Sequence, residues 1–342
     1  MYHQFTNDYS ESVHPEIWKA LTDVMSEQNR GYGLDRHSQE AERRILSCFG
    51  IPMGAVFFLG GGTQTNMTVI SFLLRPYEGV ISCDTGHINV HETAAVEGSG
   101  HKVLCVPNRN GKIDAADVEK AVRSHADEHM VKLKMVYLSD TTETGTVYSK
   151  KELTEIRRVC DKYGLLLFLD GARLGAALTC SGSDLAPEDL GKLCDVFYVG
   201  GTKNGMLFGE AVVFSKADLA REFRYQIKNR GAMLAKGFVP GAMFERAFDK
   251  DLLYFSMARH ANEMAELFVR LVEGSVEFSV RSVTNQQFLR MKKEKAEKLI
   301  RNFGCELWTD EGETQVIRVV TSFATKEEDV RSLADYIKQI GG

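Results

Sequence analysis

Apolar segments recur along the chain up to Phe214, and each is bounded by Gly, Asp or Ser. Most are apolar at nearly every position, which is typical of strands that helices cover on both faces. Segments with helical spacing lie between many of them, so the pattern predicts an α/β fold with a mainly parallel sheet. The expected strands are 55–59, 79–83, 103–106, 135–138, 165–169, 196–199 and 211–214.

The segment 150–163 carries the clearest helix signals. Its apolar residues recur every three or four positions, which places them on one face of a helix. Ser149 stands at the N-cap position with Glu152 three residues later, and Gly164 follows the last turn. Because this helix leads directly into the strand 165–169, the two form one helix-then-strand unit of an α/β sheet.

The pattern changes after Gly241. With only six prolines and no flexible spacer, the parts of the chain are expected to pack tightly. We predict a large domain over residues 1–243 and a smaller α+β domain over residues 244–342. The expected elements are a long helix over 243–272, strands near 277–283 and 287–291, a helix over 293–302, a strand over 315–320 and a helix over 327–340.

Composition excludes several classes of function. Among 342 residues, 42 Lys and Arg face 47 Asp and Glu, a formal net charge of −5 without a basic run, so nucleic acid is not expected as a partner. Seven scattered cysteines without C-x-x-C spacing indicate free thiols in a reducing compartment. No signal peptide and no stretch near the ~18 apolar residues of a membrane span are apparent, which predicts a cytoplasmic protein without a membrane partner.

Two charged residues follow neighbouring predicted strands. Lys203 lies among glycines after the strand 196–199, and Asp170 follows the strand 165–169 with Arg173 close behind. Taken singly, these residues read as an ordinary loop lysine and as a helix N-cap paired with an arginine. Because carboxyl ends of parallel strands meet at one crevice, the two side chains are expected to converge there. A partly desolvated lysine amine at such a place suits Schiff-base chemistry.

A glycine-rich turn, Gly60-Gly61-Gly62-Thr63, separates the strand 55–59 from a helical segment at 64–74. Exposed amides at a helix N-terminus, approached through small residues, form an anion site that suits phosphate. Such a turn is more often only a tight connection. It lacks the lysine and the spacing of a P-loop, and no G-x-G-x-x-G is present there.

Four further residues are candidates for the functional site, although a structural role explains each of them equally well. His87 and His91 lie one helical turn apart, but without the H-E-x-x-H order or a third ligand we predict no metal. His87 is better placed to stack on a planar cofactor. Glu143 follows the strand 135–138, and Arg318 lies in a predicted strand, where its guanidinium fork suits a substrate carboxylate. The alternative for Glu143 is an ordinary charged loop residue, and the alternative for Arg318 is an ion pair on the protein surface.

Through these residues and their spacing, the chain resembles the pyridoxal-phosphate enzymes of the threonine aldolase and β-eliminating lyase family. Within that family it resembles the low-specificity L-threonine aldolases. The likeness runs over nearly the whole chain. Its motifs are Phe5-Thr6-Asn7-Asp8, Tyr32-Gly33-Leu34-Asp35, Gly61-Gly62-Thr63-Gln64-Thr65-Asn66, His87 with Glu92, Asp170-Gly171-Ala172-Arg173 and Gly200-Gly201-Thr202-Lys203-Asn204-Gly205.

The resemblance implies a fold type I large domain, pyridoxal 5'-phosphate as cofactor, and a role for each matching residue. Lys203 would hold the cofactor as a Schiff base, and Asp170 would pair with the pyridine nitrogen. It further places Gly62 and Thr63 at the phosphate, joined by Gln64 or Thr202. It also places His87 over the ring, Arg173 near cofactor and substrate, and Asn7 and Arg318 at the substrate carboxylate.

The implied reaction cleaves a β-hydroxy-α-amino acid such as L-threonine or L-allo-threonine to glycine and an aldehyde. Many relatives carry a His near the substrate hydroxyl, where this chain has Glu143. A carboxylate accepts the hydroxyl proton if it is ionised and in reach, so Glu143 or His87 is the expected base beside the catalytic Lys203. β-Elimination and phenylserine cleavage on the same scaffold are the rival reactions, because a fold does not fix chemistry.

The resemblance also implies a homodimer or homotetramer with the site at a subunit interface. Lys228, Arg230 and Lys236 are candidates to reach a neighbour's phosphate. An ordinary solvated surface accounts for these three cations equally well.

Overall fold

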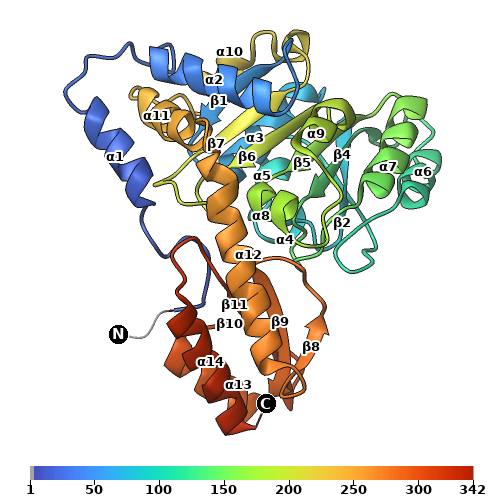
Figure 1. Ribbon diagram of the computed structural model, residues 1–342. Helices are drawn as coiled ribbons and strands as arrows, with labels where there is room; N and C mark the ends of the chain where they lie inside the picture. Colours follow the sequence, from blue (N-terminus) through green and yellow to red (C-terminus); the bar gives the residue numbers. More distant parts are fainter. Residues whose placement is uncertain (1–3, 342) are drawn as a thin grey trace.

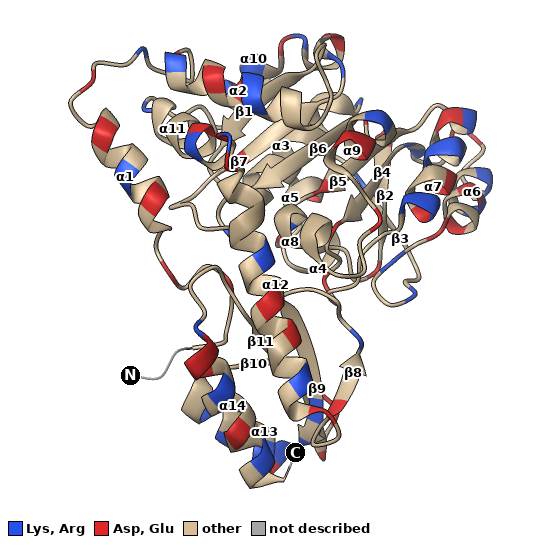
Figure 2. Cartoon of the chain, in the orientation of Figure 1, with Lys and Arg blue, Asp and Glu red and all other residues tan. Residues whose placement is uncertain are grey.

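A computed structural model describes residues 4–341 (Figure 1). A large sheet with helices on both faces forms one part of the molecule, a smaller sheet with helices forms the other, and the long helix α12 (Leu253–Val272) runs from the first into the second. Charges of both signs lie on the outer helices, while the central strands of the large sheet carry few (Figure 2). Among the described residues, no helix combines the length and apolarity that a membrane span needs.

The large sheet has seven strands in the order β1-β7-β6-β5-β4-β2-β3. Within this sheet β7 runs opposite to the other six strands, which all point the same way, so the prediction of a mainly parallel sheet is confirmed. All seven predicted strands are present within a few residues of their expected bounds. These are β1 (Ala55–Leu59), β2 (Glu78–Cys83), β3 (Val103–Val106), β4 (Lys132–Ser139), β5 (Leu166–Asp170), β6 (Val196–Gly200) and β7 (Glu210–Phe214).

Two separate apolar clusters explain why the central strands are apolar at every position. Successive side chains of a strand point to opposite faces, so Val136 and Leu138 join one cluster while Met135 and Tyr137 join the other. Helices cover both clusters, as a parallel sheet requires. They are α1 (Pro15–Val24), α2 (Arg36–Cys48), α3 (Gly62–Leu73), α4 (His87–Val90), α5 (Ala95–Gly98), α6 (Ala115–Ser124), α7 (Lys150–Tyr163), α8 (Leu174–Thr179), α9 (Pro187–Leu193), η1 (Ala217–Ala220), α10 (Phe223–Asn229) and α11 (Phe238–Ala247).

Helix α7 begins and ends where its sequence signals predict. The Ser149 hydroxyl accepts the backbone N–H of Glu152, and the Glu152 carboxylate accepts the backbone N–H of Ser149 in return. Gly164 closes the helix with a φ of 64°. A left-handed residue after the last turn is favourable for glycine, which has no Cβ to clash. Local signals therefore suffice to set both ends of this helix.

The single helix predicted over 243–272 is wrong, because the structure has two helices there. Helix α11 ends at Ala247, Leu252 takes a left-handed φ of 47°, and α12 starts at Leu253. Arg246 binds the Asp251 carboxylate through both of its terminal nitrogens, at 2.9 Å each, which holds the turn between them. The break lets α11 pack on α2 while α12 leaves toward the small sheet. One straight helix cannot satisfy both contacts.

The smaller sheet is antiparallel, in the order β10-β11-β9-β8. Its strands are β8 (Glu277–Val280), β9 (Gln286–Lys292), β10 (Glu306–Asp310) and β11 (Thr314–Val320), covered by α13 (Lys293–Phe303), α14 (Glu327–Ile340) and the end of α12. Strand β10 was not predicted from the sequence, because it is a half-exposed edge strand with little apolar content. Phe5 lies fully buried in the same core, so the N-terminal segment packs here.

A buried histidine of α2 links the segment that follows α1 to helix α11. The His37 side chain is 5% exposed, with Nδ1 2.5 Å from Oε2 of Glu245 and Nε2 2.8 Å from Oε2 of Glu27. Burial disfavours the charged ring, but the two carboxylates outweigh that effect and raise the pKa of His37. A group with a raised folded-state pKa stabilises the fold fully below its unfolded pKa, and this contribution is lost as pH rises through the folded pKa.

We therefore expect His37→Gln to lower the melting temperature more at pH 5.5 than at pH 9. The loss corresponds to about 1–3 kcal/mol at the lower pH, the range for hydrogen bonds to charged groups. Thermal unfolding followed by circular dichroism at both pH values measures it, with His125→Gln at the end of α6 as the control. An equal loss at both pH values would contradict the charged His37 bridge.

Candidate functional site

The predicted site residues gather at the carboxyl ends of β4, β5 and β6, on the side that faces the small sheet. Two adjoining cavities of about 300 and 240 Å³ lie there, and Tyr9, His87 and Lys203 line both. The first is also lined by Gly60, Gly61, Gly62, Thr63, Asp170, Ala172, Tyr198, Thr202, Phe208 and Glu210. The second is also lined by His91, Glu143, Arg173, Gln286, Glu306, Trp308 and Arg318.

Lys203 sits in a tight turn that follows β6. A Cβ on Gly200 would lie 2.2 Å from the carbonyl oxygen of Ala172, so only glycine lets β6 pass so close to the loop after β5. Burial, together with the nearby Arg173 charge, lowers the pKa of Lys203. A neutral amine is the nucleophilic form, and the lowered pKa of Lys203 makes this form easier to reach for attack on a carbonyl group.

Glu210, at the first position of β7, fixes that turn from below. Its carboxylate accepts the backbone N–H of Gly201 at 2.9 Å and the hydroxyl of Thr202 at 2.8 Å. Thr202 in turn accepts the backbone N–H of Gly209. Burial raises the pKa of Glu210 to about 7, even though these donors oppose the shift. Thr202 lines the larger cavity, with its hydroxyl hydrogen-bonded to Glu210, a residue to which the sequence did not point.

Asp170 ends β5 and is 4% exposed. Burial alone would raise the pKa of this carboxyl. The adjacent His87 ring and the hydrogen bonds from Tyr137, Tyr198 and Asn66 together hold the pKa below its ordinary value. Asp170 is thus an ionised acceptor at the wall of the larger cavity, which suits a protonated ring nitrogen.

The N-terminus of α3 faces the same cavity. Gly61 takes the N-cap position without a side-chain cap, and a Cβ on it would meet nothing within 4 Å. The amides of the first turn, at Gly62 and Thr63, therefore lie open to a ligand, and the helix dipole favours an anion. Gln64 lies outside the cavity lining, with its side-chain oxygen accepting the backbone N–H of Gly60 at 3.2 Å. It shapes the turn rather than the wall.

His87 and Glu143 meet between the two cavities. His87 Nδ1 lies 2.7 Å from Oε1 of Glu92, whose side chain is fully buried. Oε1 of Glu143 accepts the backbone N–H of His87 at 2.9 Å and the hydroxyl of Ser139 at 2.6 Å. Its Oε2 is buried without a hydrogen-bond partner. Burial raises the pKa of Glu143, and the Ser139 hydrogen bond opposes that shift.

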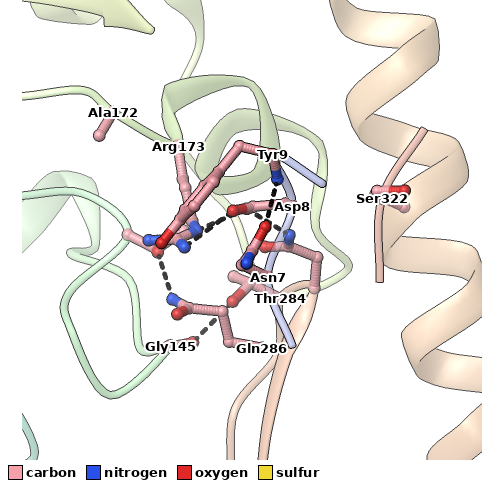
Figure 3. Close-up of polar contacts among 12 residues, drawn as sticks. Asn7, Asp8, Tyr9, Gly145, Ala172, Arg173, Thr284, Gln286 and Ser322 are labelled. Carbon is pink, nitrogen blue, oxygen red and sulfur yellow. Dashed lines mark hydrogen bonds and ion pairs between the residues drawn. The ribbon is translucent and has the colours of Figure 1, made fainter. Parts of the chain in front are cut away.

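The two predicted arginines differ in what they already bind. Arg173 donates two hydrogen bonds to the Asp8 carboxylate, from Nε at 2.6 Å and from Nη2 at 2.9 Å (Figure 3). Arg318 donates to Gln286 at 3.1 Å and to Glu306, and its Nε is buried without a partner. Each guanidinium thus uses two of its five N–H donors on these partners, Arg173 from its Nε and Nη2 edge and Arg318 from its two terminal nitrogens, and both keep donors for a carboxylate.

Asn7 lies beside this cluster and does not line either cavity. Its side-chain oxygen accepts the backbone N–H of Tyr9 at 2.9 Å and the hydroxyl of Ser10 at 3.0 Å. Figure 3 shows Asn7 next to Asp8, with the Tyr9 ring extending toward Arg173. In this arrangement Asn7 sets the turn that brings Tyr9 and Asp8 into the site.

Several residues of the site were not predicted from the sequence. Tyr137 and Tyr198 stand in apolar strands, where a tyrosine reads as core, and Trp308 lies on the unpredicted strand β10. Asp8 and Glu92 fell inside quoted motifs but received no role. Glu210 offered the best signal, since it is a charge at the start of an otherwise apolar strand.

Lys228 lies on α10, Arg230 directly follows it, and Lys236 lies just before α11. These three side chains line neither cavity. Lys228 Nζ lies over the Tyr32 ring, 5.4 Å from its centroid, and Nε of Arg230 is buried without a partner. Within residues 4–341, no three His, Cys, Asp or Glu side chains are grouped so as to hold a metal ion.

Comparison with known proteins adds the family context. The family model for β-eliminating lyases matches residues 5–294. A low specificity L-threonine aldolase of Pseudomonas aeruginosa is 33% identical, with 99% of this chain and 98% of that protein covered. Its counterpart from Pseudomonas sp. (strain NCIMB 10558) is 32% identical, with 98% and 97% covered.

Solved structures agree with this match. A threonine aldolase of Leishmania major superposes with a TM-score of 0.96 at 38% identity, covering 99% of this chain and all of that one. Aspartate aminotransferase of Thermus thermophilus shares the fold alone, with a TM-score of 0.74 at 15% identity and coverage of 99% and 92%. The predicted fold class, a fold type I large domain with a smaller α+β part, is confirmed.

Proposed function

The chain belongs to the β-eliminating lyase family, and on this basis we propose that it is a pyridoxal-phosphate enzyme that cleaves threonine-type β-hydroxy-α-amino acids to glycine and an aldehyde. The observation that carries the proposal is the convergence of Lys203, Asp170 and the open amides of α3 on one cavity. Full-length relatives named as low specificity L-threonine aldolases support the reaction.

The residues around the larger cavity fit this cofactor group by group. The Lys203 amine, with its lowered pKa, suits the aldehyde, the ionised Asp170 suits a protonated ring nitrogen, and the amides of Gly62 and Thr63 suit the phosphate. When bound, pyridoxal phosphate supplies an aldehyde that amines join and a ring that withdraws electrons from the α-carbon of the amino acid.

We assign the substrate carboxylate to Arg318 in the smaller cavity. Gln286 holds one terminal nitrogen of its guanidinium, and the Trp308 ring lies 4.9 Å from its central carbon. These contacts fix the plane of the fork, which orients a bound carboxylate and with it the rest of the substrate. Arg173, whose Nε and Nη2 are held by Asp8, contributes a positive charge beside Lys203 and Arg318.

We assign the removal of the β-hydroxyl proton to Glu143. Its Oε1 accepts hydrogen bonds from two donors, while its Oε2 has no hydrogen-bond partner. Glu143 and Lys203 both line the smaller cavity. A carboxylate of raised pKa is a stronger base than an exposed one. We assign His87 to stack over the cofactor ring, as the resemblance implies. Glu92 binds its Nδ1 and sets the orientation of the imidazole.

The cavity also supports the proposal of a homodimer or homotetramer. Tyr9, although it lines both cavities, is 51% exposed. Trp18 of helix α1 and Met25 just after that helix are exposed as well. Apolar groups beside an open cavity are typical of a surface that a second copy covers. All seven cysteines are free thiols, which supports a reducing compartment such as the cytoplasm.

Lys203→Ala tests the central assignment. We expect the variant to lose the visible absorbance of the lysine-bound cofactor, its trapping by borohydride, and the release of glycine and acetaldehyde from L-allo-threonine. Lys216→Ala, at an exposed position after β7, should keep all three. Pyruvate and ammonia in place of glycine and aldehyde would show elimination instead, and a fully active Lys203→Ala would overturn the assignment.

Glu143→Gln should lower kcat at least about tenfold while cofactor affinity stays within about twofold, because the amide cannot accept the proton. Since the base must be ionised, native kcat/KM should fall as pH drops through the raised pKa of Glu143, and the variant should lack this limb. Glu42→Gln, at another partly buried carboxyl of raised pKa remote from the site, should retain it. An unchanged pH profile in Glu143→Gln would assign the base to His87.

Trp18→Glu tests the interface. We expect the native protein to elute as a dimer or tetramer and the variant to shift toward the monomer with weaker cofactor binding, since a buried unpaired charge opposes association. Size-exclusion chromatography with light scattering measures it. Tyr77→Glu, at an equally exposed aromatic before β2, serves as the control. A native monomer with full activity would refute the assembly.

A further inference from the structure

Two buried tyrosines flank Asp170 in the centre of the large sheet. Because β5 lies between β4 and β6, Tyr137 of β4 and Tyr198 of β6 reach the carboxylate from opposite sides. Each is 1% exposed. The Tyr198 hydroxyl donates to Oδ1 of Asp170 at 2.5 Å, and the Tyr137 hydroxyl donates to Oδ2.

Two further donors complete the surroundings of this carboxylate. The backbone N–H of Ala172 donates to Oδ1, and the side-chain amide of Asn66 donates to Oδ2, both at 3.0 Å. Each oxygen thus accepts two hydrogen bonds from the protein, so a ring nitrogen cation would meet this carboxylate through its negative charge or by displacing one of these donors. A protonated carboxyl would turn one acceptor position into a donor that faces another donor. The arrangement therefore favours the ionised form of Asp170.

We propose that Tyr137 and Tyr198 are positioning residues that keep Asp170 ionised and fixed in one plane before a cationic ligand group reaches it. The inference rests on the proposed function for the identity of that group, a protonated ring nitrogen. Of the two tyrosines, only Tyr198 lines the cavity with Asp170, where a Cβ on Gly62 would lie 3.2 Å from its hydroxyl oxygen. Tyr137 is the donor from within the core.

The charges around Asp170 make such donors necessary. The basic side chains near it are His87 of α4 and Lys203 of the turn after β6. The acidic groups nearby are Glu92 after α4, Glu143 after β4 and Glu210 of β7. Burial and three neighbouring carboxyls favour protonation of Asp170, and the phenols oppose it. Burial raises the pKa of both phenols far above their ordinary value, so they remain donors.

The test replaces each phenol by a ring of the same shape. We would measure the ionisation of Asp170 in the full chain before cofactor is added, by ¹³C NMR of labelled Asp side chains, with the resonance assigned by its loss in Asp170→Asn. In the native protein, we expect the midpoint of this resonance to lie below the ordinary midpoint of an aspartate. Tyr137→Phe and Tyr198→Phe should each raise the midpoint by about one pH unit, and the double variant by about two.

The matched control is Tyr254→Phe. Tyr254 is fully buried, and its hydroxyl accepts the backbone N–H of Gly175 rather than contacting Asp170, so the midpoint of Asp170 should not move. Cofactor affinity measured by equilibrium dialysis should fall at acid pH in the phenylalanine variants and not in the control. If the double variant fails to fold, the two single variants decide the question.

A midpoint within about 0.3 unit of native in both single variants would overturn the proposal. The NMR titration is read on the protein alone, so its failure leaves the proposed reaction standing. Conversely, a product analysis that showed another reaction would not change the ionisation of Asp170. The two outcomes are therefore distinguishable.

Discussion

The buried carboxylate of Asp170 is the constraint on which the rest of the structure depends. An ionised group at the end of the central strand of a parallel sheet is stable only if it is fully hydrogen-bonded or paired with a cation. The fold meets this requirement with donors from both neighbouring strands, from α3 and from the loop after β5. The apolar layers on both faces of the sheet then hold these donors in place.

The same principle extends to the other acids of the site. Glu92, Glu143 and Glu210 are all at most 9% exposed, and each has one or both carboxylate oxygens fixed by donors. Acidic groups held in this way around one lysine and one histidine form a site prepared for positively charged nitrogen groups. Amino-acid chemistry on a pyridine ring brings such groups, which is why the electrostatics and the family membership agree.

The small domain completes the site from the other side. Arg318 and Trp308 come from its sheet, and the N-terminal segment that carries Asp8 is anchored in its core through Phe5. Asp8 then crosses to Arg173 of the large domain, and Asn285 after β8 donates to the same carboxylate. One buried ion pair therefore links three distant parts of the chain where the two sheets meet, so the relative position of the sheets fixes the smaller cavity.

By itself, the sequence determined the parallel sheet, the caps of α7, and the placement of Lys203 and Asp170 at neighbouring strand ends, because these follow from local periodicity and from the geometry of parallel strands. Only the tertiary structure decided that α11 and α12 are separate helices, that Gln64 and Asn7 shape turns outside the cavity walls, and that Asp8 occupies Arg173. It also decided the roles of Tyr137, Tyr198 and Glu210. Each of these depends on contacts between segments far apart in the chain, and no local pattern records which buried polar group will find which partner.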